Sequence, residues 1–392
     1  MNLLTITWPG GGNNPFEFFT KCIRQHMQSL GTCCFDVELN DRFASHLLDI
    51  TRQHRIDVAI TFQGMGSNLY NQEQQNIWEW LTIKLLCLHG DHPCHVPNNH
   101  VADSSHVLHL YGAPSWALYS EKYFARKRPV QFFMPPQFFQ RKQRIEPRTS
   151  ECFFVFPKNL EDTSKLIEEW QSQYPAPLAG FLIMAAQAIM DSYQAGDGIE
   201  HHALIDQLLF PEKFAQLCHA IGPSSEPDFF HAIHSMLDRV YRSHASESVL
   251  KELKDVPLQI YGIGWDRHKP HASKHHTFKT FDTLSNGEYQ YASRYGIIDA
   301  SPSCDVLHDR SLRALGWGSG FLSNCQLDLA NWVGHAQDGL FYGGRPGDLR
   351  EKAEAVMTDP DRHQARAIEL GQAYNRSFSM AQFQRNLIHL MS

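Results

Sequence analysis

The residues best suited to chemistry fall in four short stretches, each of which follows a run of apolar residues. The richest stretch holds Ser303, His308, Asp309 and Arg310, and a glycine turn follows at Gly318. His308 and Arg310 offer donors just before a segment with helical spacing. A cationic side chain beside a helix N-terminus makes a good seat for a diphosphate. The alternative interpretation is an exposed helix cap with an ion pair.

The second stretch, residues 89–95, contains Asp91 and His92 directly after a predicted strand. In an open α/β sheet the carboxyl ends of the strands face the ligand crevice. Either side chain is therefore a candidate general base toward an acceptor hydroxyl or amine. The histidines and the cysteine of this loop also suggest a zinc site, although their spacing matches no standard zinc pattern. A plain polar loop is the third interpretation.

The third stretch is a glycine-rich segment that contains Gly11, Gly12 and Asn13, immediately after the first predicted strand. Glycines let backbone N–H groups approach a ligand, and a following helix offers its positive end to an anion. The segment is neither a Walker loop nor a G-x-G-x-x-G fingerprint. We expect it to line a cleft, with a tight turn as the alternative.

The fourth stretch is a G-x-G-W sequence formed by Gly262, Gly264 and Trp265 at the end of a predicted strand. Two glycines and an aromatic ring in this position predict a floor on which a nucleobase stacks. A lone G-x-G is a weak signal, so a purely structural turn stays open as the alternative.

The elements that must position these residues alternate between strands and helices. Continuous apolar strands are predicted at 3–7, 35–37, 57–62, 84–88, 107–110 and 130–134, with helical patterns between them. Apolar strands joined by helices indicate a parallel sheet with crossover helices on both faces, which is a doubly wound sheet.

The length of 392 residues predicts two domains. A proline pair and a charged stretch place the boundary near 136–150. We expect a Rossmann-like domain over 1–150, a mostly helical stretch over 151–255, and a second Rossmann-like domain with a closing helix over 256–392. The helical stretch is either an insertion or the start of the second domain.

Composition narrows the class of protein. The chain has 35 basic and 42 acidic residues, a formal charge of −7, which argues against a dedicated nucleic-acid binder. Its nine cysteines are irregularly spaced without a C-x-x-C, and no signal peptide is apparent, so we expect a cytoplasmic protein. The longest apolar run, 177–190, is shorter than the roughly 20 residues of a membrane span.

The segment from about residue 261 to the C-terminus resembles the second domain of CgeB-like glycosyltransferases, within the larger set of family-4-type enzymes of GT-B fold. Such proteins tend to show a strand ending in G-x-G-W, as residues 261–265 do here. They also show an H-D-R triplet that opens a helix closed by a glycine turn, as residues 308–310 and Gly318 do. The match covers about a third of the chain, and the stretch 159–253 resembles nothing we can name.

The resemblance implies a metal-independent glycosyltransferase of the hexosyltransferase class, without a cofactor. The second domain would hold a nucleotide-sugar donor and the first an acceptor, which is a glycan, a lipid or a protein. The donor-binding residues it implies are Gly262, Gly264, Trp265, Ser303, His308, Asp309, Arg310 and Gly318. Many family-4-type enzymes carry a glutamate five residues before the glycine turn, where it bonds the donor ribose. This sequence has Arg313 there, which points to a different nucleotide contact, an unusual donor or lost activity.

Three alternatives stay open. Another nucleotide-sugar enzyme, such as an epimerase, would need no acceptor. A non-catalytic GT-B-like nucleotide-binding or scaffold protein would explain Arg313. A metal-binding protein is suggested by 23 histidines, among them His201, His202, His231 and His234.

Overall fold

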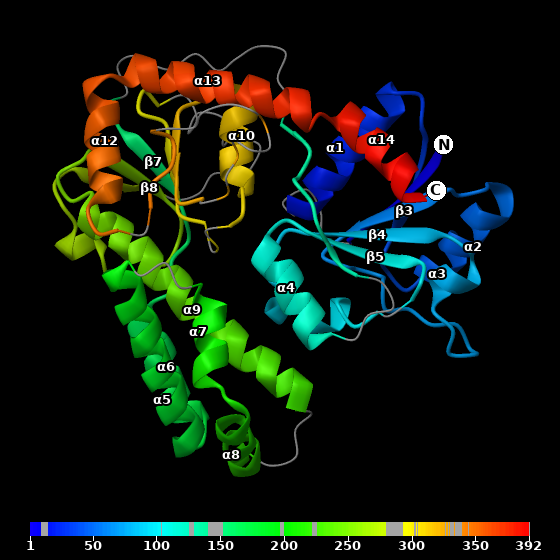
Figure 1. Cartoon of the computed structure of the whole chain (residues 1–392), viewed down its shortest axis with the longest axis horizontal. Helices are drawn as coiled ribbons and strands as arrows, with labels where there is room; N and C mark the ends of the chain where they lie inside the picture. The colour runs from blue at the N-terminus through cyan, green and yellow to red at the C-terminus, as the bar shows by residue number, and fades with distance from the viewer. Residues whose placement is uncertain are drawn as a thin grey trace. The chain divides into compact units, whose positions relative to one another are not determined.

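The computed structural model of the chain (Figure 1) divides into two compact units. Unit 1 comprises Met1–Gln140 and Tyr374–Ser392, and unit 2 comprises Arg141–Ala373. The structure describes residues 1–8, 15–102, 104–124, 129–139, 152–196, 200–221, 226–279, 293–301, 303, 305–325, 327, 329, 333, 339–343 and 345–391.

Unit 1 is built on a parallel sheet of six strands in the order β2-β1-β3-β4-β5-β6. The strands are β1 (Asn2–Thr7), β2 (Cys33–Glu38), β3 (Val58–Phe62), β4 (Lys84–His89), β5 (Val107–Tyr111) and β6 (Gln131–Phe132). The connecting helices are α1 (Pro15–Ser29), α2 (Phe43–Gln53), α3 (Ile77–Trp80), η1 (Pro93–His95), η2 (Pro97–Asn99) and α4 (Pro114–Tyr123). The predicted strands of the first sheet are confirmed.

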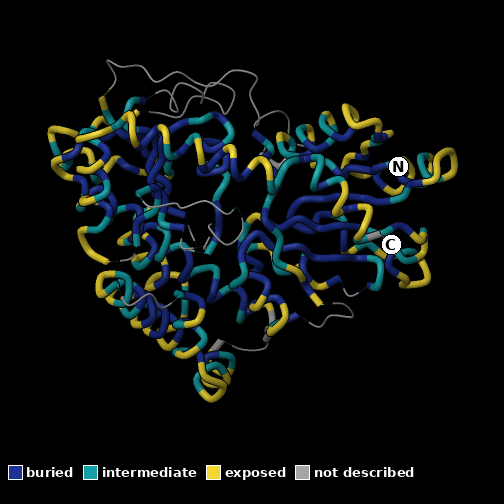
Figure 2. The backbone as a smooth tube through the Cα atoms, turned by 45° about the horizontal axis from the view of Figure 1, so that its top comes forward, coloured by how far each residue is buried: buried dark blue, intermediate teal, exposed yellow. Residues whose placement is uncertain are grey.

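Both faces of this sheet are covered, as the buried tube of its strands in Figure 2 shows. Leu3 packs on one face with Ile23 of α1 and Leu387 of α14 (Met380–Met391). Its neighbour Leu4 packs on the other face with Leu47 of α2. Successive side chains of a strand point to opposite faces, so a strand buried on both sides reads as a continuous apolar run.

Unit 2 holds a second parallel sheet, in the order β11-β10-β7-β8-β9. Its strands are β7 (Phe154–Pro157), β8 (Leu258–Tyr261), β9 (His276–Lys279), β10 (Ile297–Asp299) and β11 (Phe321–Ser323). Three described helices follow its later strands: α10 (Asp309–Trp317), α12 (Asp348–Thr358) and α13 (Pro360–Ser377). The two sheets confirm the predicted fold class, two doubly wound α/β domains.

The stretch 151–255 lies in the first part of unit 2 and is mostly helical. Its strand β7 is the central strand of the second sheet, paired with β8 and β10. Five helices follow before β8: α5 (Thr163–Gln173), α6 (Ala176–Ala195), α7 (His201–Leu208), α8 (Pro211–Ile221) and α9 (Glu226–Glu252). They pack around a core of their own that includes Trp170, Leu182 and Ile233.

The C-terminal helix α14 belongs to a different unit from the one that the sequence predicts. The sequence predicts one domain over 256–392, but α14 belongs to unit 1, and the division falls inside α13. The apolar residues Met380, Phe383 and Leu387 of α14 join the core that also contains Leu3 and Ile60. Helical periodicity predicts that a helix has an apolar face, but it does not say which sheet covers that face.

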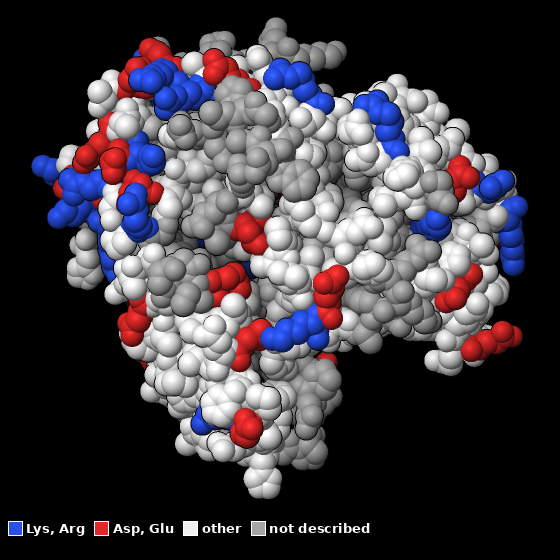
Figure 3. All heavy atoms as spheres, viewed as in Figure 1, with Lys and Arg blue, Asp and Glu red and all other residues white. Residues whose placement is uncertain are grey.

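Charged side chains of unit 2 are mixed in sign. In the face drawn in Figure 3, Lys and Arg are interspersed with Asp and Glu over α12 and the adjoining part of α13. Arg350 contacts both Asp255 and Glu354 there. Among the helices that the structure describes, none combines the length and the apolar character needed to cross a bilayer.

The loop after β8 depends on two glycines for a close backbone approach. Gly264 has φ +89°, and a Cβ on it would lie 1.8 Å from the carbonyl oxygen of Leu160. A Cβ on Gly262 would lie 2.2 Å from the carbonyl oxygen of Lys158. The two glycines therefore let the chain after β8 lie directly against the chain after β7.

We expect Gly264→Ala to destabilise the fold far more than Gly347→Ala. Gly347 has a nearly equal φ of +86°, but a Cβ on it would meet nothing within 4 Å. Both substitutions carry the cost of a left-handed backbone, about 1–2 kcal/mol. Only Gly264→Ala adds a backbone clash, worth about 1–3 kcal/mol more. Urea unfolding of the two variants measures the difference, and equal losses would show that the close approach is unimportant.

Candidate functional site

The candidate site of unit 2 lies at the carboxyl ends of two neighbouring strands, β7 and β10. Lys158 follows the last residue of β7, and Asp299 is the last residue of β10. The Lys158 ammonium donates a hydrogen bond to the carbonyl oxygen of Ala300 at 3.2 Å. In doubly wound sheets this edge is where ligands bind. We call Lys158, Asp299, His308, Asp309 and Arg310 the strand-end cluster.

Asp299 is the buried centre of the strand-end cluster, with 0% of its side chain exposed. Arg310 Nε donates to Oδ1 at 3.0 Å, and the Ser311 hydroxyl donates to Oδ2 at 2.7 Å. Burial acts to raise the pKa of Asp299, but Arg310, His308 and the Ser311 hydrogen bond together hold it below its usual range. The carboxylate therefore stays ionised and holds Arg310 at the start of α10.

The N-terminus of α10 carries a second carboxylate. His308 is the N-cap residue, and its Nδ1 lies 2.6 Å from Asp309 Oδ1. Arg313 donates to Asp309 Oδ2 at 3.4 Å. Burial acts to raise the pKa of Asp309, yet His308, Arg310 and Arg313 lower it well below its usual range. Carboxylates and cations thus alternate around a helix end whose first N–H groups favour an anion.

Arg313 contacts two residues of its own helix. It stands where the resemblance would place a ribose-binding glutamate. Its side chain is 9% exposed, and its guanidinium carbon lies 5.4 Å from the centre of the Trp317 ring. Asp309 and Trp317 lie one helical turn to either side, so Arg313 is held by both neighbours. Gly318 ends this helix in the left-handed conformation with φ 67°.

Lys158 has an electrostatic environment unlike that of a surface lysine. Burial, together with the positive charges of Arg310 and Arg242, lowers its pKa to about 7. The positive charge of a protonated lysine in such surroundings is not fully balanced by nearby negative charges. A bound anion would therefore stabilise the protonated form. Perturbed lysines of this kind cluster at functional sites.

Two further loops complete this edge of the second sheet. The Ser303 hydroxyl donates to Asp305, which fixes the loop between β10 and α10. The Asn324 side chain accepts from the Ser301 N–H at 2.7 Å and donates to the Ser301 carbonyl oxygen at 3.1 Å. These contacts hold the chain segments after β10 and β11 together.

The expected role of Trp265 as a stacking floor does not agree with its position. The ring is 1% exposed and lies in the core with Phe156 and Ile260. Its indole N–H donates to the Lys158 carbonyl oxygen at 2.7 Å. Trp265 therefore anchors the loop after β7 and presents no open ring face to a nucleobase. Gly262 and Gly264 stay predicted donor contacts beside Lys158.

In unit 1, the two residues expected to act as a base, Asp91 and His92, make different contacts. Asp91 is half-buried after β4, and its Oδ2 accepts from Gln63 Nε2 at 3.0 Å. His92 is 2% exposed, and its Nδ1 accepts the N–H of Cys94, so it caps η1. This contact gives the His92 ring a structural role at η1, and both Asp91 and His92 stay predictions for the base. Gly11, Gly12 and Asn13 lie outside the described residues.

Sequence reasoning missed Lys158 and Gln63. Both are polar residues that directly follow a fully buried strand, which is the signal that could have found them. Gln63 also has an unusual left-handed backbone with φ 53°. A non-glycine residue in that region stores strain that is often found at functional sites.

Neither a protein-family model nor a curated protein matches this sequence. Solved structures do match its fold. HepE of Anabaena, solved with UDP-glucose, has a TM-score of 0.53 at 11% identity, covering 100% of this chain and 99% of that one. The sucrose-phosphate synthase of Thermosynechococcus elongatus has a TM-score of 0.53 at 8% identity, covering 99% of both chains.

An α-glucosyltransferase solved with UDP-glucose and DNA containing an abasic site is a third match. Its TM-score is 0.51 at 7% identity, covering 100% of this chain and 99% of that one. The chain has the GT-B fold. Because one fold hosts many activities, the activity of this GT-B chain has to be argued from its own strand-end cluster.

We expect Asp299→Asn to lower the free energy of unfolding by about 3 kcal/mol, because it removes the buried carboxylate charge that pairs with the mostly buried Arg310 at 3.0 Å. The matched control is Asp361→Asn, which breaks the 3.0 Å ion pair with Arg294. Asp361 is 81% exposed, so this loss should stay below about 1 kcal/mol. Denaturant unfolding at pH 7 compares the two, and equal losses would remove the Asp299–Arg310 pair from its structural role.

Proposed function

We propose that the protein is a glycosyltransferase that moves a sugar from a nucleoside diphosphate sugar to an acceptor hydroxyl or amine. The observation that carries the proposal is the strand-end cluster, in which Lys158 contacts the Ala300 carbonyl oxygen and the adjacent Asp299 holds Arg310 in the first turn of α10. The GT-B fold supports it, since two of the matching structures were solved with UDP-glucose. The sequence resemblance of residues 308–318 to CgeB-like enzymes supports a place in that subfamily.

The chemistry follows from charge development during transfer. The acceptor oxygen or nitrogen forms a bond to the anomeric carbon as the bond from that carbon to the diphosphate oxygen breaks. The acceptor proton passes to a base, and the diphosphate leaves with an added negative charge. Lys158 and the N–H groups at the start of α10 are placed to stabilise that charge, which is electrostatic catalysis. No step in this scheme requires a metal ion or a cofactor.

The residues of the strand-end cluster have different roles in the proposed reaction. Lys158 provides a positive charge that its surroundings do not fully compensate. Arg310, by contrast, is ion-paired with Asp299 through Nε, so its first task is to position the N-terminus of α10. Asp91 of unit 1, held by Gln63, is our candidate for the base. Nucleotide binding therefore depends most directly on Lys158.

The first test is a panel of nucleoside diphosphates and nucleoside diphosphate sugars in thermal unfolding. A ligand that binds only the folded state at 100 times its Kd stabilises the fold by about 2.7 kcal/mol, and Tm rises accordingly. We expect a shift with at least one nucleotide, reduced in Lys158→Met. The control Lys165→Met replaces an exposed lysine of α5 and should keep the shift. No shift with any nucleotide would contradict the proposal.

The pH dependence of binding tests the role of Lys158 separately. Its pKa of about 7 means that the ammonium is lost as pH rises from 6 to 8. If only the protonated form binds the diphosphate, the Kd for UDP-glucose should rise about tenfold over this range. Calorimetry should show that Lys158→Arg removes this dependence, because arginine stays charged, whereas Lys165→Arg keeps it. A Kd that does not change with pH in the unmodified protein would exclude Lys158 from the donor contact.

Two other functions are distinguished by the products. An epimerase would convert the donor sugar without an acceptor, and a binding or scaffold protein would bind the nucleotide without consuming the donor. Chromatography of the donor after incubation with glycan, lipid and protein acceptors separates these outcomes. Transfer that appears only with an acceptor, with release of nucleoside diphosphate, is the result that we expect. A cytoplasmic location stays a prediction from the cysteines.

A further inference from the structure

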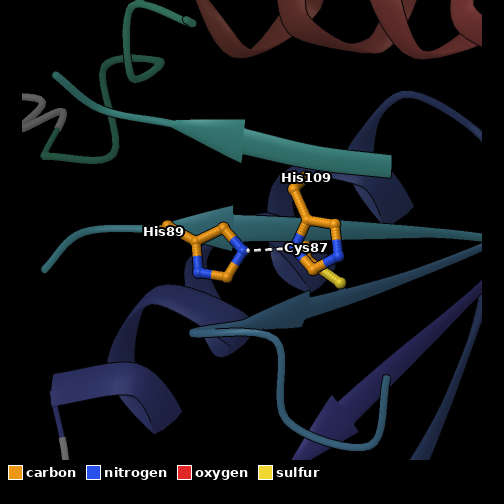
Figure 4. A group of neighbouring side chains, drawn as sticks. All are labelled: Cys87, His89 and His109. Atoms are coloured by element: carbon orange, nitrogen blue, oxygen red, sulfur yellow. Dashed lines mark hydrogen bonds between the residues drawn. The ribbon is translucent and has the colours of Figure 1, made fainter. Parts of the chain in front are cut away.

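Three side chains of types that bind metals meet inside unit 1. Cys87 and His89 lie on β4, and His109 lies on the neighbouring strand β5, directly opposite Cys87. Residues two apart on a strand share a face of the sheet, and a register partner shares it too. Figure 4 shows the two imidazole rings edge to edge, with the sulfur of Cys87 beside the ring of His109.

The geometry of this group is close to that of a metal site. One ligand atom from each residue lies within 4.8 Å of the other two. His89 Nε2 and His109 Nδ1 are 2.9 Å apart. Two nitrogens bound to one tetrahedral zinc, each at about 2.0–2.1 Å, lie about 3.3–3.4 Å apart. An ion would enter this site if the two nitrogens separated by about 0.4 Å and both rings turned until their lone pairs converged on it.

The positions of these residues need a physical explanation. Cys87, His89 and His109 are 0%, 1% and 3% exposed, on the sheet face that also carries Leu85 and Val107. Imidazoles at apolar sheet positions lose their hydration unless they gain partners. The hydrogen bond between His89 and His109 holds one proton between two nitrogens, and an added proton would place a positive charge in this buried site. A divalent ion can take the place of the shared proton, which then moves to the other nitrogen of its own ring.

Two neighbouring rings pack against His89, one of the three side chains. The ring of His89 stacks on Tyr111 at 4.6 Å and faces His100 at 4.2 Å between centroids. His100 Nδ1 and the Tyr111 hydroxyl are 2.7 Å apart. The ring of His89 is therefore packed between two neighbouring rings that limit its rotation.

We propose that Cys87, His89 and His109 bind one divalent transition-metal ion in the sheet of unit 1. One thiolate and two imidazoles suit zinc best, and three protein ligands leave its fourth position to a water. Binding releases the thiol proton, because cysteine binds as a thiolate, and the proton between the two imidazoles moves to the far nitrogen of its own ring, because histidine binds as a neutral imidazole. This site is independent of the proposed sugar transfer. It would join β4 to β5 just before the loop that carries Asp91.

The test uses the full chain, stripped of metal by a chelator and titrated with Co²⁺ as a spectroscopic probe. We expect one ion per chain, with the intense visible bands of tetrahedral Co²⁺ and a near-ultraviolet charge-transfer band from a thiolate. Zn²⁺ should displace the cobalt and raise Tm. A chain that binds no stoichiometric Co²⁺, or binds it without the thiolate band, would overturn the proposal.

Substitutions of single residues test which side chains bind the metal ion. Cys87→Ser should abolish the thiolate band, and His109→Gln should weaken Co²⁺ binding by more than the roughly 10–100-fold that loss of an outer partner costs. Two controls should keep both properties: Cys34→Ser on β2 and His106→Gln, which precedes β5. A thiolate band that survives in Cys87→Ser, or is lost in Cys34→Ser, would contradict the assignment. If Cys87→Ser fails to fold, the spectrum and stoichiometry of the unmodified chain decide the question.

Discussion

The buried ion pair between Asp299 and Arg310 is the interaction on which the candidate donor site depends. Asp299 ends β10 with no exposed surface, and Arg310 and Ser311 in the first turn of α10 satisfy its two oxygens. An unpaired carboxylate in that position would cost free energy of folding. Because its partners Arg310 and Ser311 lie in the first turn of α10, the pairing fixes where that helix begins. Burial, and after it the positive charges of Arg310 and Arg242, lowers the pKa of Lys158 to about 7. The pair thus positions a helix N-terminus, and its guanidinium also contributes to the lowered pKa of the neighbouring lysine.

The sequence predicted the layers of the fold well, because strands buried on both faces leave continuous apolar runs and helices leave a 3.6-residue period. It also located the start of α10, since His308, Asp309 and Arg310 stand together. Three features lay outside that signal. Trp265 stands beside two glycines like a binding residue but is a core residue, the surroundings that lower the pKa of Lys158 come from distant parts of the chain, and α14 packs on the first sheet. Each depends on contacts between residues more than 80 positions apart, which local patterns do not encode.

Within the strand-end cluster, some charged residues position α10, and Lys158 is the residue proposed to bind the anion. Arg313, Asp309 and Trp317 form one connected set along α10, and the Asp299 pair anchors the start of that helix. These residues make the N-terminus of α10 rigid, so that its N–H groups keep their direction without a ligand. Lys158, on the adjacent strand end, supplies the charge that responds to an anion. In the proposed transfer, these N–H donors and the one responsive cation would stabilise a leaving diphosphate.

The central claim is that Lys158 contacts the diphosphate of a nucleotide-sugar donor, and affinity labelling tests it most directly. A uridine diphosphate that carries pyridoxal in place of the sugar presents an aldehyde next to the phosphates. A lysine with a pKa of about 7 has enough neutral amine at pH 7.5 to form an imine with it, which borohydride then traps. Peptide mapping should find the label on Lys158, with UDP or UDP-glucose preventing it. Label on other lysines only, or label on Lys158 that neither nucleotide reduces, would contradict the account.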